Sequence, residues 1–278
     1  MKNAGVERMA RIKSDKPKGV LKPPPGGEGS HYARYHPSPD LEFFVEHYWI
    51  VQWNLTGQEP RLQETLPHPS IHLVFQRHSS RVVGVVTGRF SILLSGRDGV
   101  FGIKFLPGAF YPFLKSPVSR ITNKVLCLTD VFDVDVHTLE DAIMSQTCDY
   151  KMIELAEAFL RERLPDRDEK VPEVRRIVER ILTDREITSV DDVVDRTGMN
   201  KRALQRLFSR YVGASPKWVI KRYRLLEAAE QLASNQPADL SRLAVDLGYF
   251  DQAHFIKDFK SIVGKSPAEF AKSTALEP

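Results

Sequence analysis

Three side chains near the C-terminal end of the chain combine residue types and spacing suited to paired hydrogen bonds. Arg202, Gln205 and Arg206 are three and four residues apart, so a helix would place all three on one face. A guanidinium can form two hydrogen bonds with guanine at once, and a glutamine amide can do the same with adenine. Because many polar helix faces are simply solvated, this interpretation depends on the elements around the three residues.

The stretch that contains these residues is repeated along the chain. Phe208 returns as Phe259, 51 positions later, and Pro216 returns as Pro267 at the same interval. The second copy carries its own hydrogen-bonding groups in the corresponding stretch, which are Gln252, His254 and Lys257, with Ala253 beside them. Two polar faces at matched spacing favour a shared binding role over a solvated surface.

Each copy is typical of two helices joined by a tight turn. In the first copy, Ser189 is placed to cap one helix, Gly198 to end it and Asn200 to cap the next. In the second copy, Ser241, Gly248 and Asp251 are expected to play the same three parts. The apolar residues of each second helix, Leu204 and Phe208 or Phe255 and Phe259, form the stripe that we expect to be buried.

A connecting helix is predicted over residues 217–233, which contain no Gly or Pro. Its length would be about 25 Å at 1.5 Å per residue. Helices that read bases in successive major grooves on one side of DNA lie about 34 Å apart. A rigid connector of this length plus half the width of each unit is compatible with that spacing.

Residues 171–278 resemble the DNA-binding domain of AraC/XylS-type transcriptional regulators. The matching segments are Arg224-Leu225 with Ala228 and Leu232, Gly248-Tyr249-Phe250-Asp251, His254-Phe255, Phe259-Lys260 and Gly264-Lys265-Ser266-Pro267. The resemblance implies two helix–turn–helix units that enter adjacent major grooves of double-stranded DNA. It also implies RNA polymerase as a partner.

The resemblance assigns roles to individual side chains by position. The base-reading group is Arg202, Gln205 and Arg206 in the first unit, and Gln252, His254 and Lys257 in the second, with Ala253 also at the groove. Further basic residues of the same helices, Lys201, Arg210 and Lys260, are expected to contact phosphates. Lys257 stands where arginine is common in the family, and lysine lacks the planar fork for paired bonds.

Charge and composition divide the chain of 278 residues into three parts. Residues 1–30 carry seven basic and three acidic groups with several Pro and Gly, which predicts a disordered basic arm. Residues 31–165 are predicted to form a β-rich sensor that ends in an amphipathic helix, and residues 171–278 an all-helical domain. The fold class is therefore α+β, with the net charge of +4 too small to identify a partner.

The sensor part alternates β-type runs with turn signals, which favours a cupin-like barrel or sandwich. Strands are expected over residues 48–53, 71–76, 81–87, 90–94 and 100–106, with a turn at 96–99. A helical stripe runs from Met152 through Phe159 to Leu164. It could pack on its own sheet or against a second copy of the chain, so a homodimer is left open.

A small-molecule effector is the partner that this sensor is expected to bind. Trp49, Val51 and Trp53 share one strand face, and Lys104 interrupts an apolar strand, which suits an aromatic pocket for an anionic ligand. The simpler alternative is that the tryptophans are ordinary core residues. No cofactor and no metal are expected, because Pro67 and Pro69 prevent His68 and His72 from sharing a helical turn.

Other classes of protein receive less support. Two cysteines, Cys127 and Cys148, are too few for a disulfide framework, and no apolar run or leader is long enough for a membrane segment. A cytoplasmic location is expected. A DNA-repair methyltransferase remains an alternative, although it needs an activated cysteine and both are poorly placed for one. No catalytic residues are assigned, and a sequence-specific DNA-binding regulator without enzymatic activity is the leading interpretation.

Overall fold

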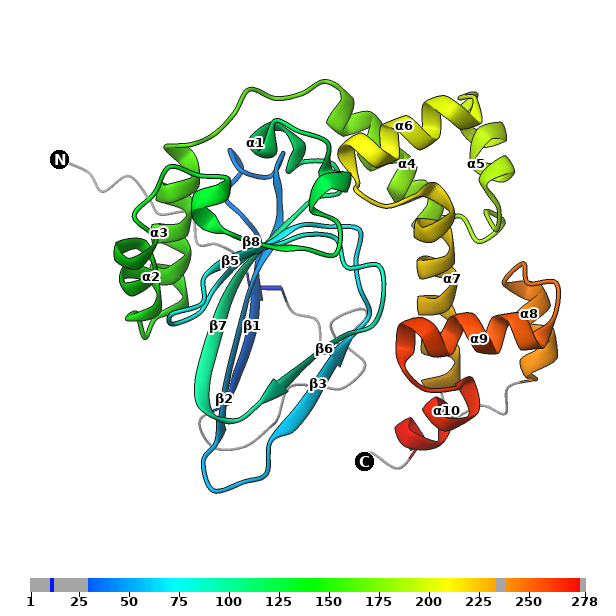
Figure 1. The fold of residues 1–278 in the computed structure, drawn as a ribbon, viewed down its shortest axis with the longest axis horizontal. Coiled ribbons are helices and arrows are strands. Elements are labelled where there is room, and N and C mark those ends of the chain that lie inside the picture. The colour runs from blue at the N-terminus through cyan, green and yellow to red at the C-terminus, as the bar shows by residue number, and fades with distance from the viewer. Residues whose placement is uncertain (1–10, 13–29, 234–238, 276–278) are drawn as a thin grey trace.

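The computed structural model describes residues 11–12, 30–233 and 239–275, so the basic arm expected over residues 1–30 lies almost entirely outside it. A β-rich part and an all-helical part follow one another along the chain (Figure 1). The α+β architecture expected from the sequence is confirmed.

The β-rich part is built on an antiparallel sheet with the strand order β1-β2-β7-β4-β5-β8. The bounds of these strands are β1 His31–Tyr35, β2 Val45–Leu55, β7 Gly96–Phe105, β4 His72–Phe75, β5 Arg81–Val83 and β8 Val125–Cys127. A separate ribbon pairs β3 (Arg61–Thr65) with β6 (Phe90–Leu94) and stands away from the lower end of the sheet (Figure 1).

Two details of the strand prediction are wrong. The turn expected at residues 96–99 is instead the start of β7, where Gly96 pairs with Leu55 and Gly99 with Gln52 along the edge of β2. The prediction failed because two glycines and a charged pair are turn signals, whereas here the long neighbour β2 holds them in a ladder. The run expected over 81–87 forms a strand only over Arg81–Val83.

Helices α2 (Val136–Met144) and α3 (Asp149–Arg161) cover one face of the sheet (Figure 1). Phe159 of α3 packs edge-on against Phe75 of β4, and Met152 and Leu160 are buried in the same core. The amphipathic stripe therefore packs on the sheet of its own chain, which is one of the two alternatives expected from the sequence. Leu164 lies beyond the end of α3.

The helical part contains the two expected turn units and the connector between them. Its elements are α4 Lys170–Thr183, α5 Val190–Thr197, α6 Lys201–Tyr211, α7 Pro216–Ala233, α8 Leu240–Asp246, α9 Gln252–Val263 and α10 Pro267–Ala275. Figure 1 shows α7 upright, with α6 at its upper end and α9 towards its lower end. The connecting helix is confirmed, one residue longer than expected at its N-terminal end.

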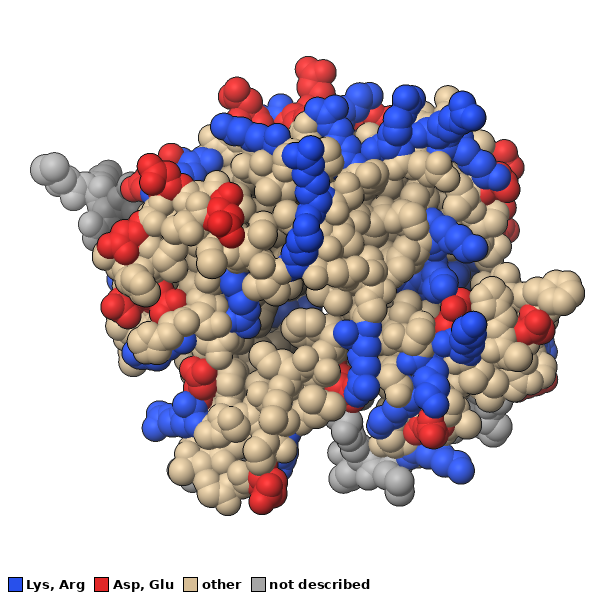
Figure 2. Space-filling view, viewed as in Figure 1, with Lys and Arg blue, Asp and Glu red and all other residues tan. Residues whose placement is uncertain are grey.

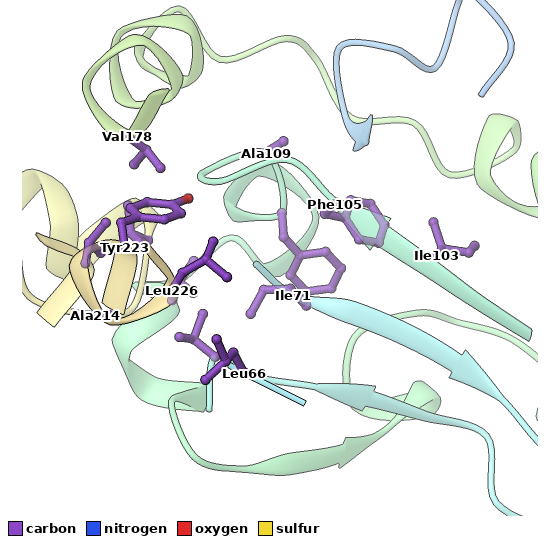
Figure 3. Packing of buried hydrophobic residues seen from close by; sticks show 14 of the residues in the cluster. Leu66, Ile71, Ile103, Phe105, Ala109, Val178, Ala214, Tyr223 and Leu226 are labelled. Atoms are coloured by element: carbon purple, nitrogen blue, oxygen red, sulfur yellow. The ribbon is translucent and has the colours of Figure 1, made fainter. Parts of the chain in front are cut away.

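The β-rich and helical parts share one cluster of buried hydrophobic residues. Tyr223 and Leu226 of α7 lie beside Leu66 and Ile71 of the sensor, and Val178 of α4 closes over them (Figure 3). Side chains that precede the loop between α3 and α4 in the sequence thus pack against side chains that follow it. Burial of this kind stabilises one arrangement of the two parts.

A short segment between strands β7 and β8 also joins the two parts. It includes α1 (Tyr111–Leu114) and a 3₁₀ turn, η1 (Val118–Ile121), which precede a second 3₁₀ turn, η2 (Leu128–Asp130). The backbone of Gly84 approaches η1 so closely that a Cβ atom there would lie 1.8 Å from the carbonyl oxygen of Ile121. Because glycine has no Cβ atom, only glycine allows this close approach. The contact sets the distance between η1 and the sheet.

Substituting Gly84→Ala is expected to lower the free energy of unfolding by about 1–3 kcal/mol, because the added methyl group meets backbone and not a movable side chain. Gly88→Ala is the matched control, since a Cβ at Gly88 has nothing within 4 Å. Urea denaturation of both variants measures the difference. Equal midpoints for the two variants would contradict the account of η1.

Candidate nucleic-acid interface

The first helix–turn–helix unit is closed by the local hydrogen bonds that its sequence predicts. The Ser189 side chain accepts from Asp192 N at the start of α5, and Gly198 ends α5 with a φ of 69°. The Asn200 side chain then accepts from Ala203 N at 2.9 Å and begins α6. All three predicted capping positions of the first unit are confirmed.

The outward face of α6 carries the three side chains singled out first in the sequence. Leu204 and Phe208 are buried, whereas Arg202, Gln205 and Arg206 are exposed. Within the described part of the chain, none of the latter three makes a hydrogen bond or an ion pair. Their donors are therefore available to a ligand that lies along α6.

A shallow hollow of about 500 Å³ runs along this face. Arg202, Gln205, Arg206, Ser209 and Arg210 line one side of it, and Pro117 of the sensor lines the other. The recognition face of the first unit is thus flanked by the sensor as well as by solvent.

Several hydrogen bonds hold the sensor against the end of α6. Ser209 Oγ donates to Ser119 Oγ at 3.1 Å, and Thr122 Oγ1 donates to the carbonyl oxygen of Gly213. Arg210 Nε donates to the Tyr111 hydroxyl at 2.7 Å. Its guanidinium carbon also lies 4.8 Å from the centre of the Tyr111 ring, so Arg210 is engaged by the sensor rather than free.

The second unit begins with a different cap from the one expected. Asp239, not Ser241, is the N-cap of α8, and its carboxylate accepts from the backbone N–H groups of Ser241 and Arg242. Carboxylate and hydroxyl are both good N-caps, and the apolar pattern alone could not set the helix start to within two residues. Gly248 and Asp251 are in their predicted places, with Asp251 accepting from His254 N at 2.7 Å.

The polar face of α9 is partly engaged in local contacts. Gln252 Oε1 accepts from Ser241 Oγ at 3.1 Å, and His254 Nε2 lies 3.3 Å from a carboxylate oxygen of Asp258. Lys257 is exposed and makes no hydrogen bond or ion pair among the described residues. Ala253 is also exposed, so backbone can approach closely there.

Phe250, to which the sequence assigned no role, also belongs to this surface. It lies in the turn before α9 with 95% of its surface exposed, the largest value among the exposed large hydrophobic residues. Phe250 precedes the polar face of α9, which begins at Gln252. The sequence signal that could have identified Phe250 is its position in a turn, where no apolar residue is needed for the core.

The residues expected to contact phosphate differ in how they are held. Lys201 Nζ forms an ion pair with Asp191 of α5 at 2.6 Å. Lys260 is exposed in the last turn of α9, and Arg210 is bonded to Tyr111. Figure 2 shows that basic side chains gather along the upper edge of the molecule, over α4, α5 and α6.

The sensor residues Trp49, Trp53 and Lys104 lie on the same face of the sheet. Trp53 is 4% exposed in a small cluster with Leu55, Val74, Leu94 and Val100, and Trp49 packs at its edge. Lys104 lies on the central strand β7 and its Nζ donates to Glu46 Oε1 at 2.9 Å. Because β7 lies between β2 and β4, Lys104 interrupts the apolar pattern inside the sheet and not on an edge strand.

The environment of Lys104 changes the acid–base behaviour of its neighbours. Burial would raise the pKa of Glu46, but the nearby Lys104 ammonium, the hydrogen bond with His47 and the neighbouring His68 together hold that pKa well below the usual range. Burial and then the charge of Lys104 lower the pKa of His72 to about 3. Trp49 Nε1 donates to His72 Nδ1 at 3.2 Å, which agrees with a neutral imidazole.

Among the described residues, no three His, Cys, Asp or Glu side chains are arranged to hold a metal ion. The helices of the described segments are too short or too polar to cross a membrane. Cys127 and Cys148 are both free and exposed.

A chain with two capped helix–turn–helix units on one connecting helix belongs to the class of double helix–turn–helix DNA-binding proteins. Residues 193–273 match a family described as a helix-turn-helix domain, and residues 33–127 match a domain of unknown function (DUF6597). The second match covers most of the sheet.

Curated relatives place the chain within that class. The probable transcription factor PqrA of Proteus vulgaris is 31% identical over 108 residues, which cover 38% of this chain and 86% of PqrA. The transcriptional activator AarP of Providencia stuartii is 38% identical over 98 residues, 34% of this chain and 69% of AarP. The chain belongs to the AraC/XylS-type family of transcriptional regulators.

Other relatives are matched over a smaller share of their length. An uncharacterized HTH-type transcriptional regulator of Haemophilus influenzae is 31% identical over 87 residues, which are 31% of this chain and 29% of that protein. This chain thus spans less than a third of that relative.

Substituting Asn200→Ala is expected to lower the free energy of unfolding by about 1 kcal/mol, because Ala203 N loses its acceptor at the start of α6. Asn200→Ser keeps an acceptor and should retain most of the stability. Chemical denaturation followed by circular dichroism compares the three proteins. If Asn200→Ala unfolds at the wild-type midpoint, Asn200 is not the stabilising cap.

Proposed function

We propose that this protein is a sequence-specific DNA-binding regulator that places α6 and α9 in two successive major grooves of one DNA site. The observation that carries the proposal is the exposed, unpaired face of Arg202, Gln205 and Arg206 on a capped helix. A second capped helix, α9, lies towards the other end of α7, which has 18 residues and hence a length of about 27 Å. With the half-width of each unit, this agrees with grooves about 34 Å apart.

In this proposal, Arg202, Gln205 and Arg206 read base edges from the first unit. Gln252, His254 and Lys257 act in the second unit, where Gln252 and His254 exchange their local partners for bases. These exchanges cost little for Gln252 and His254, which are half-buried and exposed, and the buried Asp258 keeps its ion pair with Lys221 at 2.9 Å. Phe250 is placed to contact a thymine methyl group or a sugar beside the polar row.

Lys201, Arg210 and Lys260 contact phosphates in the same proposal. Lys201 would exchange Asp191 for a phosphate, and both partners of the present ion pair are more than half exposed. Arg210 would have to leave the Tyr111 hydroxyl, so phosphate binding there is linked to the contact between α6 and the sensor. Lys260 needs no such exchange among the described residues.

The sensor is proposed to adjust DNA binding in response to a small molecule bound near Trp49, Trp53 and Lys104. The shared core of the sensor and α7 supports this, since a ligand that changes the sheet also changes the packing of the connector. RNA polymerase is a proposed partner by family membership, and a homodimer and a cytoplasmic location are proposed with it.

Arg206→Ala is expected to weaken binding of the intact chain to its selected DNA site by about 1–3 kcal/mol and to relax the choice of one base pair. The site is first obtained by selecting bound fragments from random DNA. Arg97→Ala removes an exposed arginine at the start of β7 and should leave the affinity unchanged. If Arg206→Ala weakens binding to the selected site and to a scrambled site equally, Arg206 contacts a phosphate and not a base.

Binding of the intact chain to DNA is expected to fall steeply with salt, because basic side chains displace counterions from phosphates. If Lys201, Arg210 and Lys260 each contact one phosphate, a plot of log affinity against log salt concentration has a slope of about −2.7. Each single alanine variant should reduce the size of this slope by about one. Affinity that does not change between low and physiological salt would rule out the phosphate roles.

A further inference from the structure

A short segment of the β-rich part lies beside the outward face of α6. This flanking segment, residues 111–124, contains α1 and η1 and packs on α6 through η1. Ser119 of η1 accepts a hydrogen bond from Ser209 of α6 at 3.1 Å, and Thr122 donates to the carbonyl oxygen of Gly213. The flanking segment is thus fixed to the helix that is proposed to read bases in the first unit.

The charge of the flanking segment is opposite to that of the β-rich part as a whole. Residues 31–169 contain 14 Lys and Arg against 18 Asp and Glu, which gives a net charge of −4. The flanking segment contains three basic residues, Lys115, Arg120 and Lys124, and no acidic residue. The helix that it faces, α6, has no acidic residue either. An acidic part of the chain therefore presents a basic segment at the place where it meets α6.

Two of these cations, Lys115 and Arg120, are exposed and free to bind an anion. Lys115 directly follows α1, and Arg120 lies in η1, so the two bracket Pro117 along the chain. Neither side chain makes a hydrogen bond or an ion pair within the described part of the chain. Exposed cations are often unpaired, so the significance of these two comes from what lies next to Pro117.

The hollow of about 500 Å³ described above separates Pro117 from the base-reading side chains of α6. Its other lining residues all belong to α6, and three of them are arginines. The hydrogen bonds between the flanking segment and α6 are made at Ser209 and Arg210, near the C-terminal end of the helix. The flanking segment therefore stands beside the base-reading donors and does not cover them.

The dimensions of DNA indicate what such a neighbour of α6 would meet. An α-helix with its side chains is about 10–12 Å across, and the major groove of B-DNA is about 12 Å wide. A helix that enters the groove therefore fills it, and groups at its flank face the sugar–phosphate backbone at the edge. Lys and Arg supply many of the phosphate contacts in such interfaces. The flanking segment has both the position and the charge for this role.

We propose that the flanking segment is itself part of the DNA interface, with Lys115 and Arg120 contacting phosphates at the edge of the groove that receives α6. The β-rich part then adds two phosphate contacts to the three assigned to the helical part. This inference rests on the proposed function, because it takes α6 to lie in a major groove. The bonds at Ser209 and Gly213 hold the flanking segment in place while DNA is bound.

The proposal makes the two ends of the DNA site unequal. Phosphates beside the α6 half-site are contacted by both parts of the chain, whereas the described hydrogen bonds join no group of the β-rich part to α9. A change in the β-rich part that withdraws the flanking segment from α6 removes both additional contacts together. The affinity for DNA is thereby coupled to the packing of the β-rich part on the first unit.

The test measures how the affinity of the intact chain for its selected DNA site depends on salt. Because each phosphate contact contributes about −0.9, the double variant Lys115→Gln with Arg120→Gln is expected to change the slope from about −4.5 to about −2.7. The matched control, Lys151→Gln with Arg97→Gln, removes the same two charges from exposed positions on α3 and β7 and should leave the slope unchanged. Arg120→Lys keeps a cation and should also keep the slope, which a purely structural role of the guanidinium would not predict.

Ethylation of single phosphates on the selected site locates the contacts. Ethylation of one or two phosphates beside the α6 half-site should weaken binding by the wild-type chain and leave binding by the double variant unaffected. An unchanged slope and ethylation pattern in the double variant would overturn this inference and leave the proposed function standing. Tighter binding by Ser119→Ala, which loosens the flanking segment from α6, would also overturn it, since the segment would then obstruct DNA. A wild-type chain that selects no site from random DNA would refute the proposed function itself.

Discussion

The burial of α7 between the sensor and the two helix–turn–helix units is the constraint on which the rest of the structure depends. Tyr223 and Leu226 bury apolar surface against Leu66 and Ile71, and Arg222 is held by the carbonyl oxygen of Pro67. Trp218, near the start of α7, donates its indole N–H to the carbonyl oxygen of Thr87 at 2.8 Å. The connector cannot shift on the sensor without breaking these contacts, so the spacing and orientation of α6 and α9 are set in part by the sheet.

The outward faces of α6 and α9 are held differently. Arg202, Gln205 and Arg206 of α6 are unpaired among the described residues, but Arg210 and Ser209 at the far end of this helix are bonded to the β-rich part. The face of α9 has no such contact with the β-rich part in the described hydrogen bonds. Gln252 is bonded to Ser241 of α8 and His254 lies against Asp258, whereas Lys257 is unpaired among the described residues. A change in the β-rich part can therefore reach α6 more directly than α9.

The sequence predicted the elements that depend on local chemistry. Ser189, Gly198, Asn200 and Asp251 were placed correctly, because a cap bonds to backbone only two or three residues away. The error at Ser241 has the same origin, since Asp239 offers an equally suitable cap two residues earlier. The strands were found where alternation was strong, whereas β1, β3 and β8 are short segments whose pairing is decided by distant partners.

The contacts between the two parts could not be predicted in the same way. Arg222 occurs in a helix with regular apolar spacing, and nothing next to it in the chain indicates that it is buried against Pro67. Lys104 was recognised as an interruption of an apolar strand, but its partner Glu46 lies 58 residues away on β2. Likewise, the closeness of η1 to α6 depends on Gly84 meeting the backbone of Ile121, which no local pattern encodes.

In the proposed function, one connecting helix, α7, holds α6 and α9 over a single face of DNA. Protection of guanine N7 from dimethyl sulfate, measured for the intact chain on its selected site, tests this most directly because N7 lies in the major groove. The account predicts two groups of protected guanines about one helical turn apart, with the minor groove between them open. A single protected group, or two groups on opposite faces of the helix, would contradict it.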